Sequence, residues 1–335
     1  MHPTRRHSLA ALAATLASPF VATSARAQAQ PAAFPSRAIT LMVPWPAGAP
    51  SDAMARRLQV PLQKAFGQPV LVENLGGAGG SLGVARLMQM PADGHAMLVG
   101  TPTELVLSPL TMPAVRYKAD DFSLLASFGR VAYVLCCRAG LPAANLAELL
   151  RHAASADKPL SIGHIGPGSL IQLMSLDLQK TAKLSLTLVP YRGVPPMMQD
   201  VAAGQVDLCF LPLAGHTVTL LEQGRIRALG VSTPRPSTMF PNFPTLVAGD
   251  KRFERFDYDV WGGLLVRRET PPEVQQRLHA WWLEMTRDAE FLAWSRSTGS
   301  DPVPALSLAE AGRFYAREVD RYSTLLRAFP EALRG

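Results

Sequence analysis

The chain has 335 residues, of which 48% are hydrophobic and 18% charged, and its formal net charge is +7. Its basic residues are scattered singly, without a stripe of Lys and Arg interleaved with aromatic residues, and this excludes a typical nucleic-acid groove. Three cysteines are too few for a disulfide framework. We therefore expect a hydrophobic core to hold the fold and interpret the cysteines as small buried residues.

The N-terminal residues have the features of a cleavable signal peptide. Arg5 and Arg6 precede a mostly apolar run over residues 9–21, and the small-residue sequence Ala25-Arg26-Ala27 follows. We predict a signal peptide over residues 1–27 and an exported mature protein. The arginine pair also resembles the twin-arginine export pattern, so the export route stays open. About 308 residues remain, which is more than one hydrophobic core usually serves, and two lobes are expected.

Short β-branched runs alternate with helical patterns along the rest of the chain. Strands are expected over residues 39–43, 70–72, 96–99, 131–137, 160–163, 186–189, 206–211, 226–231 and 260–266. Helices are expected from a cap at residue 51 or 52 to residue 62, and over 82–88, 146–154, 170–178, 197–202, 218–222, 272–288 and 307–327. This order predicts an α/β fold with mostly parallel sheets flanked by helices.

A proline-rich stretch over residues 233–244 interrupts this alternation, and no Ser/Gly linker separates two independent domains. We expect the chain to leave a first lobe, build a second lobe and return. The predicted first lobe comprises residues 28–130 plus 232–335, and the second comprises residues 131–231.

The loop between the first strand and first helix contains Gly48, Ala49, Pro50, Ser51 and Asp52. Open α/β sheets bind ligands at the carboxyl ends of their strands. The amides of Gly48, Ala49 and Ser51 could bind a carboxylate near a helix N-terminus, although Pro50 offers no N–H. The alternative is a plain strand-to-helix turn in which Asp52 is the cap.

A second candidate loop is Gly166-Pro167-Gly168-Ser169, again between a strand and a helix. It lacks the third glycine of a dinucleotide fingerprint and the lysine of a P-loop. A cradle for a small anion remains possible, because Ser169 offers both a hydroxyl and an amide. The alternative is that Ser169 only caps the following helix.

Two further loops follow strands. Thr101 and Thr103 offer hydroxyl groups in the first lobe, and Arg192 in the second lobe could pair with a carboxylate. The alternative for Arg192 is a solvated surface residue.

Gly79-Gly80-Ser81-Leu82-Gly83 matches the nucleophile elbow of α/β-hydrolases. A flexible stretch separates it from the preceding strand, whereas an elbow needs the strand to run directly into the serine turn. A hydrolase using Ser81 is therefore the less favoured alternative, with His216 or His279 as the candidate base. The histidines and cysteines share no metal-ligand spacing, so no metal site is expected.

An ordered series of short motifs runs along the chain. They include Phe34-Pro35-Ser36-Arg37, Val43-Pro44-Trp45-Pro46-Ala47-Gly48, Val72-Glu73-Asn74, Gly77-Ala78-Gly79-Gly80, Gly168-Ser169, Val189-Pro190-Tyr191-Arg192-Gly193 and Gly204-Gln205-Val206-Asp207-Leu208. Each motif is weak alone, but the ordered set is specific. On these residues the chain resembles the Bug family of extracytoplasmic receptors, the substrate-binding components of tripartite tricarboxylate transporters.

This resemblance implies a type II periplasmic-binding-protein fold with a ligand cleft between two lobes. It also implies a periplasmic, non-enzymatic receptor without a cofactor that binds a small carboxylate and delivers it to membrane transporter subunits. We expect a monomer that does not bind nucleic acid. A ligand-sensing receptor without a dedicated transporter is the alternative.

The resemblance also implies that one carboxylate contacts the loop from Ala47 to Ser51 and the pair Gly168-Ser169. The chain departs from the family where Ala49 replaces a glycine, where Gln172 replaces a common histidine, and where Leu211 replaces a common aspartate. Leu211 argues for an apolar or aromatic distal part of the ligand. The complete set of predicted ligand-binding residues is Trp45, Ala47, Gly48, Ala49, Ser51, Asp52, Thr101, Thr103, Gly166, Gly168, Ser169, Gln172, Arg192 and Leu211.

Overall fold

The computed structural model describes residues 34–299, 303–330 and 332. The predicted signal peptide at residues 1–27 lies outside these ranges. Within them, no helix combines the length and the apolar character that crossing a membrane requires.

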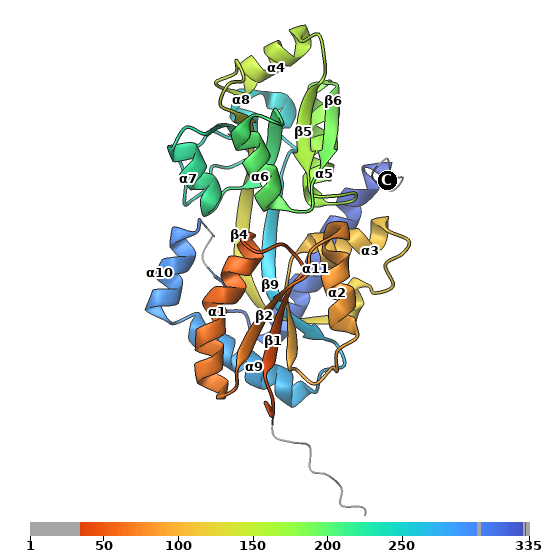
Figure 1. The fold of residues 1–335 in the computed structure, drawn as a ribbon, viewed down its shortest axis with the longest axis vertical. Coiled ribbons are helices and arrows are strands. Elements are labelled where there is room, and N and C mark those ends of the chain that lie inside the picture. Colours follow the sequence, from red (N-terminus) through yellow and green to blue (C-terminus); the bar gives the residue numbers. More distant parts are fainter. Residues whose placement is uncertain (1–33, 300–302, 331, 333–335) are drawn as a thin grey trace, which may run out of the picture. The chain divides into compact units, whose positions relative to one another are not determined.

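The strands form two sheets that share one long strand (Figure 1). The first sheet has the order β2-β1-β3-β9-β4, and the second continues as β4-β7-β5-β6, with β8 also paired to β4. Their bounds are β1 (Ile39–Val43), β2 (Val70–Asn74), β3 (Ala96–Gly100), β4 (Phe122–Arg138), β5 (Leu160–His164), β6 (Leu186–Pro190), β7 (Leu208–Pro212), β8 (Ile226–Val231) and β9 (Asp259–Arg267). Pairing is parallel among β1–β3 and among β5–β7, whereas β4, β8 and β9 pair antiparallel.

Strand β4 is 17 residues long and belongs to both sheets. Residues 122–132 pair with β9, and residues 133–138 pair with β7 and β8. The register with β9 shifts between Ser127 and Arg130, and Gly129 there has a φ of +92°, so the strand changes course without ending. The predicted strand over 131–137 is therefore too short. The expected lobe boundary at residue 130 falls inside β4 and stays a prediction.

Helices cover both sheets. Those beside the first sheet are α1 (Pro50–Phe66), α2 (Ser81–Met88), α3 (Ser108–Thr111), α9 (Pro272–Met285), α10 (Ala289–Ser297) and α11 (Leu308–Arg327). Those beside the second are α4 (Leu146–Ser155), α5 (Leu170–Ala182), α6 (Val194–Ala203), α7 (His216–Glu222) and α8 (Leu246–Gly249). Short helical turns are η1 (Ala78–Gly80), η2 (Thr103–Leu107), η3 (Ala119–Asp121) and η4 (Lys251–Phe253).

Local signals explain several helix ends. Helix α1 ends at Gly67, whose φ of 66° lies in the left-handed region, and its N–H donates to Gln63 O. Ser307 and Glu310 form a capping box at the start of α11. At the start of α1 the prediction is wrong: the helix begins at Pro50 and the cap position is Ala49, because proline fits the first helical turn.

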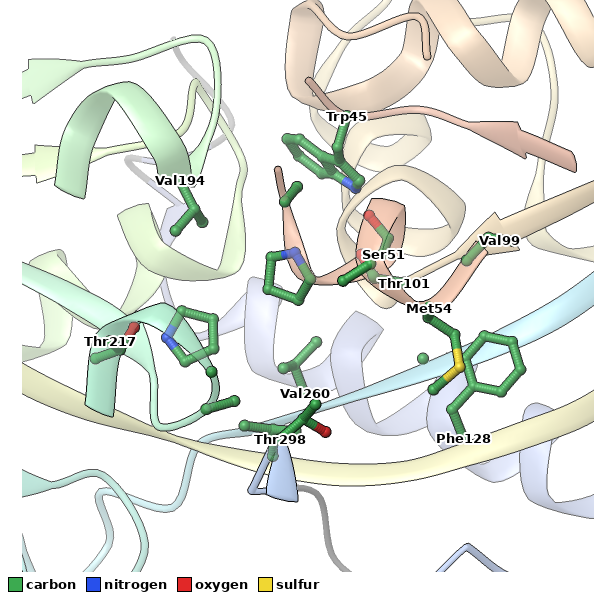
Figure 2. Close-up of a pocket in the computed structure, with 18 of the residues that line it drawn as sticks. Trp45, Ser51, Met54, Val99, Thr101, Phe128, Val194, Thr217, Val260 and Thr298 are labelled. Atoms are coloured by element: carbon green, nitrogen blue, oxygen red, sulfur yellow. The ribbon is translucent and has the colours of Figure 1, made fainter. Parts of the chain in front are cut away.

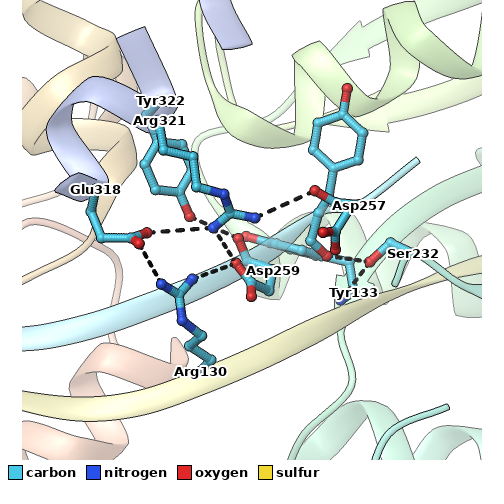
Figure 3. Close-up of polar contacts among 9 residues, drawn as sticks. Arg130, Tyr133, Ser232, Asp257, Asp259, Glu318, Arg321 and Tyr322 are labelled. Carbon is cyan, nitrogen blue, oxygen red and sulfur yellow. Dashed lines mark hydrogen bonds and ion pairs between the residues drawn. The ribbon is translucent and has the colours of Figure 1, made fainter. Parts of the chain in front are cut away.

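A cluster of paired charges attaches α11 to the crossing strands β4 and β9 (Figure 3). Arg130 of β4 binds Asp259 of β9 at 2.8 Å and also forms an ion pair with Glu318 of α11. Arg321 binds Asp259 at 2.6 Å and Glu318 at 3.4 Å. The Tyr322 hydroxyl donates to the Asp259 carbonyl at 2.8 Å. Two cations and two anions therefore neutralise one another at the junction between the sheets.

The cysteines behave as the sequence predicts. Cys136, Cys137 and Cys209 are free and buried, and Cys136 lies opposite Cys209 in the pairing of β4 with β7. Burial raises the pKa values of the Cys136 and Cys209 thiols, so both remain neutral, apolar parts of the core.

Candidate ligand-binding site

A cavity of about 340 Å³ lies between loops of the two sheets and the crossing strands (Figure 2). The first-sheet side contributes Trp45, residues 48–51, Met54, residues 99–101 and Thr103. The crossing strands contribute Phe128, Gly129, Val131, Tyr133 and residues 260–262. The second-sheet side contributes Ile165, Val194, Met198, Pro212 and residues 214–217, while Trp294 and Thr298 adjoin them. A volume of this size suits a small organic molecule.

Loops from the two sheets contact one another beside this cavity. Gly193 lies against Pro46, so that a Cβ added to Gly193 would be 2.9 Å from the Pro46 Cδ atom. The Gly215 N–H donates to the Thr298 carbonyl at 3.1 Å. These contacts join segments that are far apart in the sequence, and a molecule in the cavity would touch both sheets' loops.

The first predicted loop lines the cavity, but its hydrogen bonds differ from the prediction. The Gly48 N–H donates to the Asp52 carboxylate at 2.8 Å, and the Ala49 N–H donates to Pro46 O at 3.2 Å. Both amides are therefore already used within the loop. The Ser51 N–H and hydroxyl form no hydrogen bond within the described part of the chain, so Ser51 is the donor that remains available to a ligand.

Asp52 does not line the cavity; its carboxylate accepts a hydrogen bond from the Gly48 N–H and so fixes the conformation of this loop. Its carboxylate also accepts from Arg56 Nε at 3.0 Å. Burial acts to raise the pKa of Asp52, but the hydrogen bonds from Arg56, Gly48 and Asn74 outweigh it and hold the pKa below its usual value. The ionised Asp52 therefore fixes the turn at Gly48, and the exposed Ala47 also lies outside the cavity lining.

The Gly-Ser loop does not line the cavity in this structure, contrary to its predicted place. Ser169 is fully buried; its hydroxyl donates to Gly166 O at 2.7 Å and accepts from Gln172 N at 3.3 Å. The Gly168 N–H donates to Gln172 Oε1 at 2.5 Å. A Cβ at Gly168 would collide with Thr111, so the loop packs against α3. The alternative role of Ser169 as a helix cap is therefore the one observed.

Arg192 and Leu211 also lie outside the cavity lining. Arg192 is exposed. Leu211 is fully buried in the core, whereas its neighbour Pro212 lines the cavity. Adjacent residues of a strand point to opposite faces, so Pro212 rather than Leu211 faces the cavity here, and the role of Leu211 in ligand binding stays a prediction.

Glu104 is a residue that the sequence analysis missed. It is fully buried, and its carboxyl group accepts from the Thr101 hydroxyl at 2.6 Å, from the Thr101 N–H and from Trp45 Nε1 at 3.2 Å. Burial raises the pKa of Glu104 to about 7 despite these hydrogen bonds. Glu104 therefore positions two residues that line the cavity, Trp45 and Thr101.

The sequence feature that could have pointed to Glu104 is its spacing of three residues from Thr101. Thr101-Pro102-Thr103-Glu104 places an acid three residues after a threonine at the end of a strand, which is the pattern of a capping box. The apolar lining residues of β4 and β9 had no comparable signal, because they lie in strand interiors rather than in loops.

The geometry gives no support to hydrolysis at Ser81. Ser81 is buried at the first position of α2 and does not line the cavity. Within the described residues its hydroxyl forms no hydrogen bond to a histidine, and His279 Nδ1 instead contacts Leu125 O at 2.8 Å. The same part of the chain contains no group of His, Cys, Asp or Glu side chains arranged to hold a metal ion.

Comparison with known proteins identifies the family. The sequence profile of the tripartite tricarboxylate transporter family receptor matches residues 54–330. The chain belongs to this receptor family. The receptor is 34% identical over 277 residues to the UPF0065 protein in the tcbD-tcbE intergenic region of Pseudomonas sp. (strain P51), covering 82% of this chain and 80% of that protein. It is 28% identical over 298 residues to BugT of Bordetella pertussis, covering 88% and 90% of the two chains.

Solved structures resemble the receptor over most of its length. MatC from Rhodopseudomonas palustris with bound malate is 26% identical, with a TM-score of 0.79, and the match covers 87% of this chain and 99% of that one. An R. palustris protein with adipate is also 26% identical, with a TM-score of 0.81 and coverage of 88% and 97%. The predicted resemblance to Bug receptors, the two-lobed α/β fold and the role in solute binding rather than catalysis are confirmed by these relatives.

Proposed function

We propose that this receptor captures one small carboxylate-bearing solute in its cavity and delivers it to the membrane subunits of a tripartite transporter. The observation that carries the proposal is the cavity itself, bordered by loops of both sheets and by the strands that cross between them. Support comes from the malate and adipate bound to structurally similar proteins. The receptor would act as a monomer in the periplasm after removal of residues 1–27.

Ligand-driven closure follows from the position of the cavity. A solute that touches both sides stabilises the conformation in which the sides are together more than one in which they are apart. The two sides correspond to the predicted lobes, residues 28–130 plus 232–335 and residues 131–231, with β4 and β9 as the crossing segments. The transporter would recognise the closed conformation, because the receptor adopts it mainly when a ligand occupies the cavity.

Within the cavity we assign one carboxylate to the first turn of α1. The Ser51 N–H and hydroxyl are free donors there, and the positive end of a 17-residue helix favours an anion. Trp45, Gly48, Ala49, Thr101 and Thr103 would form the surrounding wall.

A thermal-shift and titration experiment on residues 28–335 tests the proposal. A carboxylate at about 100 times its dissociation constant should stabilise the protein by about 2.7 kcal/mol. Ser51→Ala should weaken binding about ten- to hundredfold, as expected for a hydrogen bond to a charged group. Because Ser51 caps nothing, the melting temperature of its ligand-free form should stay close to that of the parent.

Ser169→Ala is the matched control, since it removes the same hydroxyl from a helix cap outside the cavity lining. If Ser169→Ala abolished binding and Ser51→Ala did not, the carboxylate site would have to be moved to the Gly-Ser loop. If no mono-, di- or aromatic carboxylate shifted the melting temperature, the receptor function proposed here would be wrong.

A further inference from the structure

The carboxyl group of Glu104 lies directly behind the wall of the cavity. Glu104 is fully buried in η2 and does not line the cavity, whereas Trp45 and Thr101, which donate hydrogen bonds to it, both do. The Thr101 hydroxyl is 2.6 Å from Glu104 Oε2. Figure 2 shows Trp45, Ser51 and Thr101 on one side of the cavity. A single side chain, that of Thr101, therefore links Glu104 to the space that a ligand would occupy.

No cation balances this acid within the described part of the chain. The donors that contact the Glu104 carboxyl group are neutral: Trp45 Nε1 at 3.2 Å, the Thr101 hydroxyl and the Thr101 N–H. A buried carboxylate that has hydrogen bonds but no cation loses more hydration than it regains. Burial therefore raises the pKa of Glu104 to about 7, and both its protonated and its ionised form are populated near neutral pH.

Tyrosines are the titratable groups that interact electrostatically with Glu104. They are Tyr117 in the loop after α3, Tyr133 of β4 and Tyr315 of α11. Burial raises the pKa of each of them, so all three hydroxyls stay neutral at the pH values at which Glu104 titrates.

The other elements packed against η2 add no unpaired charge. Turn η1 and helix α3 contain no titratable side chain. Arg86 of α2 lies 3.6 Å from Glu73, and Glu318 of α11 forms ion pairs with Arg130 and Arg321. Glu104 is therefore the group in this region whose charge changes near neutral pH.

The proton on Glu104 decides the direction of its hydrogen bond with Thr101. An ionised carboxylate can only accept, so the Thr101 hydroxyl must then donate to it. A protonated Glu104 can donate to Thr101 Oγ1 across the same 2.6 Å, which frees the hydroxyl hydrogen of Thr101 to turn toward the cavity. Protonation thus removes a negative charge behind the wall and gives the wall one more donor.

We infer that Glu104 couples ligand binding to proton uptake: the receptor gains a proton at Glu104 when an anionic ligand binds, and it releases the ligand more readily as the pH rises. This inference rests on the proposed function and adds a form of regulation to the same site. An anion in the cavity disfavours the ionised form of Glu104, and by reciprocity a proton on Glu104 favours the anion by the same factor. Since Glu104 is protonated below its pKa, affinity is highest there and falls as the pH rises through that value.

Calorimetric titration of the mature chain, residues 28–335, with adipate and with malate tests the coupling. A ligand that raises the pKa of Glu104 from about 7 to about 8 should bind about five- to tenfold more weakly at pH 8.5 than at pH 6.5. Titrations at pH 7.5 in buffers with different heats of ionisation should show an uptake of about half a proton per bound ligand. Asp52 stays ionised over this range, because its pKa lies below its usual value.

Variants assign the proton to Glu104. Glu104→Gln cannot ionise and should lose both the pH dependence and the proton uptake, whatever its affinity at pH 6.5. Thr101→Val removes the hydroxyl that changes direction and should weaken the pH dependence without abolishing it, because the charge of Glu104 remains. Thr103→Val is the matched control, since Thr103 also lines the cavity but its hydroxyl does not contact Glu104 in the described part of the chain. This control should keep the pH dependence of the parent.

His216 needs a separate control, because it lines the cavity, is exposed and titrates at a nearby pH. His216→Gln should keep the proton uptake at pH 7.5. Loss of that uptake in His216→Gln, or its persistence in Glu104→Gln, would assign the proton to a group other than Glu104 and overturn the inference.

The outcomes also separate the inference from the proposed function. If adipate or malate binds the parent protein equally well at pH 6.5 and pH 8.5 without proton uptake, the coupling is wrong while the receptor function stands. If neither these two compounds nor any other mono-, di- or aromatic carboxylate binds at either pH, the proposed function fails and the coupling fails with it. The titrations of the parent protein do not depend on whether any variant folds.

Discussion

Replacing Glu104 with glutamine should change how the stability of the receptor depends on pH. Burial raises the pKa of Glu104 to about 7 in the folded protein, against an ordinary value of 4.5 for a solvated glutamate. Between these values the folded state holds a proton that the unfolded state has released, so the stability of the parent protein falls as pH rises from 4.5 to 7. The shift corresponds to about 3 kcal/mol, at about 1.4 kcal/mol per pKa unit.

Glu104→Gln keeps the shape of the protonated acid and cannot ionise. Both carboxyl oxygens of Glu104 accept from N–H groups, and the amide nitrogen of glutamine cannot accept, so the variant starts at pH 4.5 with a fixed offset in its free energy of unfolding. From that starting difference the variant should gain about 3 kcal/mol relative to the parent by pH 8. The groups that interact electrostatically with Glu104 are Tyr117, Tyr133 and Tyr315, and burial raises the pKa of each of them, so none of them titrates in this range.

Urea unfolding of both proteins at a series of pH values measures this difference. The parent–variant comparison cancels the titration of all other groups, which makes the test specific for Glu104. A difference that stays constant from pH 4.5 to pH 8 would refute the reasoning, because Glu104 would then have the same pKa in the folded and unfolded states.

Three further predictions concern the cap, the charge cluster and the loop contact. Ser169→Ala should lower the free energy of unfolding by about 1 kcal/mol through loss of the helix cap, with ligand affinity retained in titrations; unchanged stability would contradict the cap. Glu318→Ala leaves Arg130 and Arg321 with a surplus positive charge. It should lower the free energy of unfolding in urea by about 1–3 kcal/mol, less than for a fully buried ion pair, because the two arginines are about one-third exposed. Gly193→Ala brings a Cβ to 2.9 Å from Pro46 and should weaken ligand binding about five- to hundredfold by opposing the contact between the loops. Equal affinities of this variant and the parent would show that the Pro46 contact is not needed for binding.

The sequence predicts those elements whose formation is governed by local signals. The strand over 39–43 and the helix over 307–327 have the predicted positions within one residue, because β-branched runs and a capping box specify them. The predicted length of β4 was too short. Gly129 is a residue that often ends a strand, but here the residues on both sides of it pair with β9, so the strand continues. Helix α10 was not predicted: of its nine residues the buried ones are Phe291 and Ser295, too few to give a clear helical period.

Local sequence signals also predicted some of the residues that line the cavity, but not the others. Trp45, Ser51 and Thr101 follow strand ends, and the rule that ligands bind there leads to residues that line the cavity. Phe128 and Val260 lie within crossing strands, and only the tertiary fold brings strand interiors to a cavity wall. The Ser169 hydroxyl is buried beside Gly166 and caps α5, while its role in ligand binding stays a prediction.

The position of β9 has a consequence for the order in which the two sheets of the receptor can form. In the first sheet β9 lies between β3 and β4, although it follows both of them by more than a hundred residues. Until residues 259–267 have been synthesised, β3 and the first half of β4 each lack a neighbour and expose unpaired edges. The second sheet needs no later segment, because β4 to β8 follow one another in the chain. We therefore expect the second sheet to form first and the first sheet to be completed only when the chain returns, which makes the chain without β9 in place the form most exposed to aggregation.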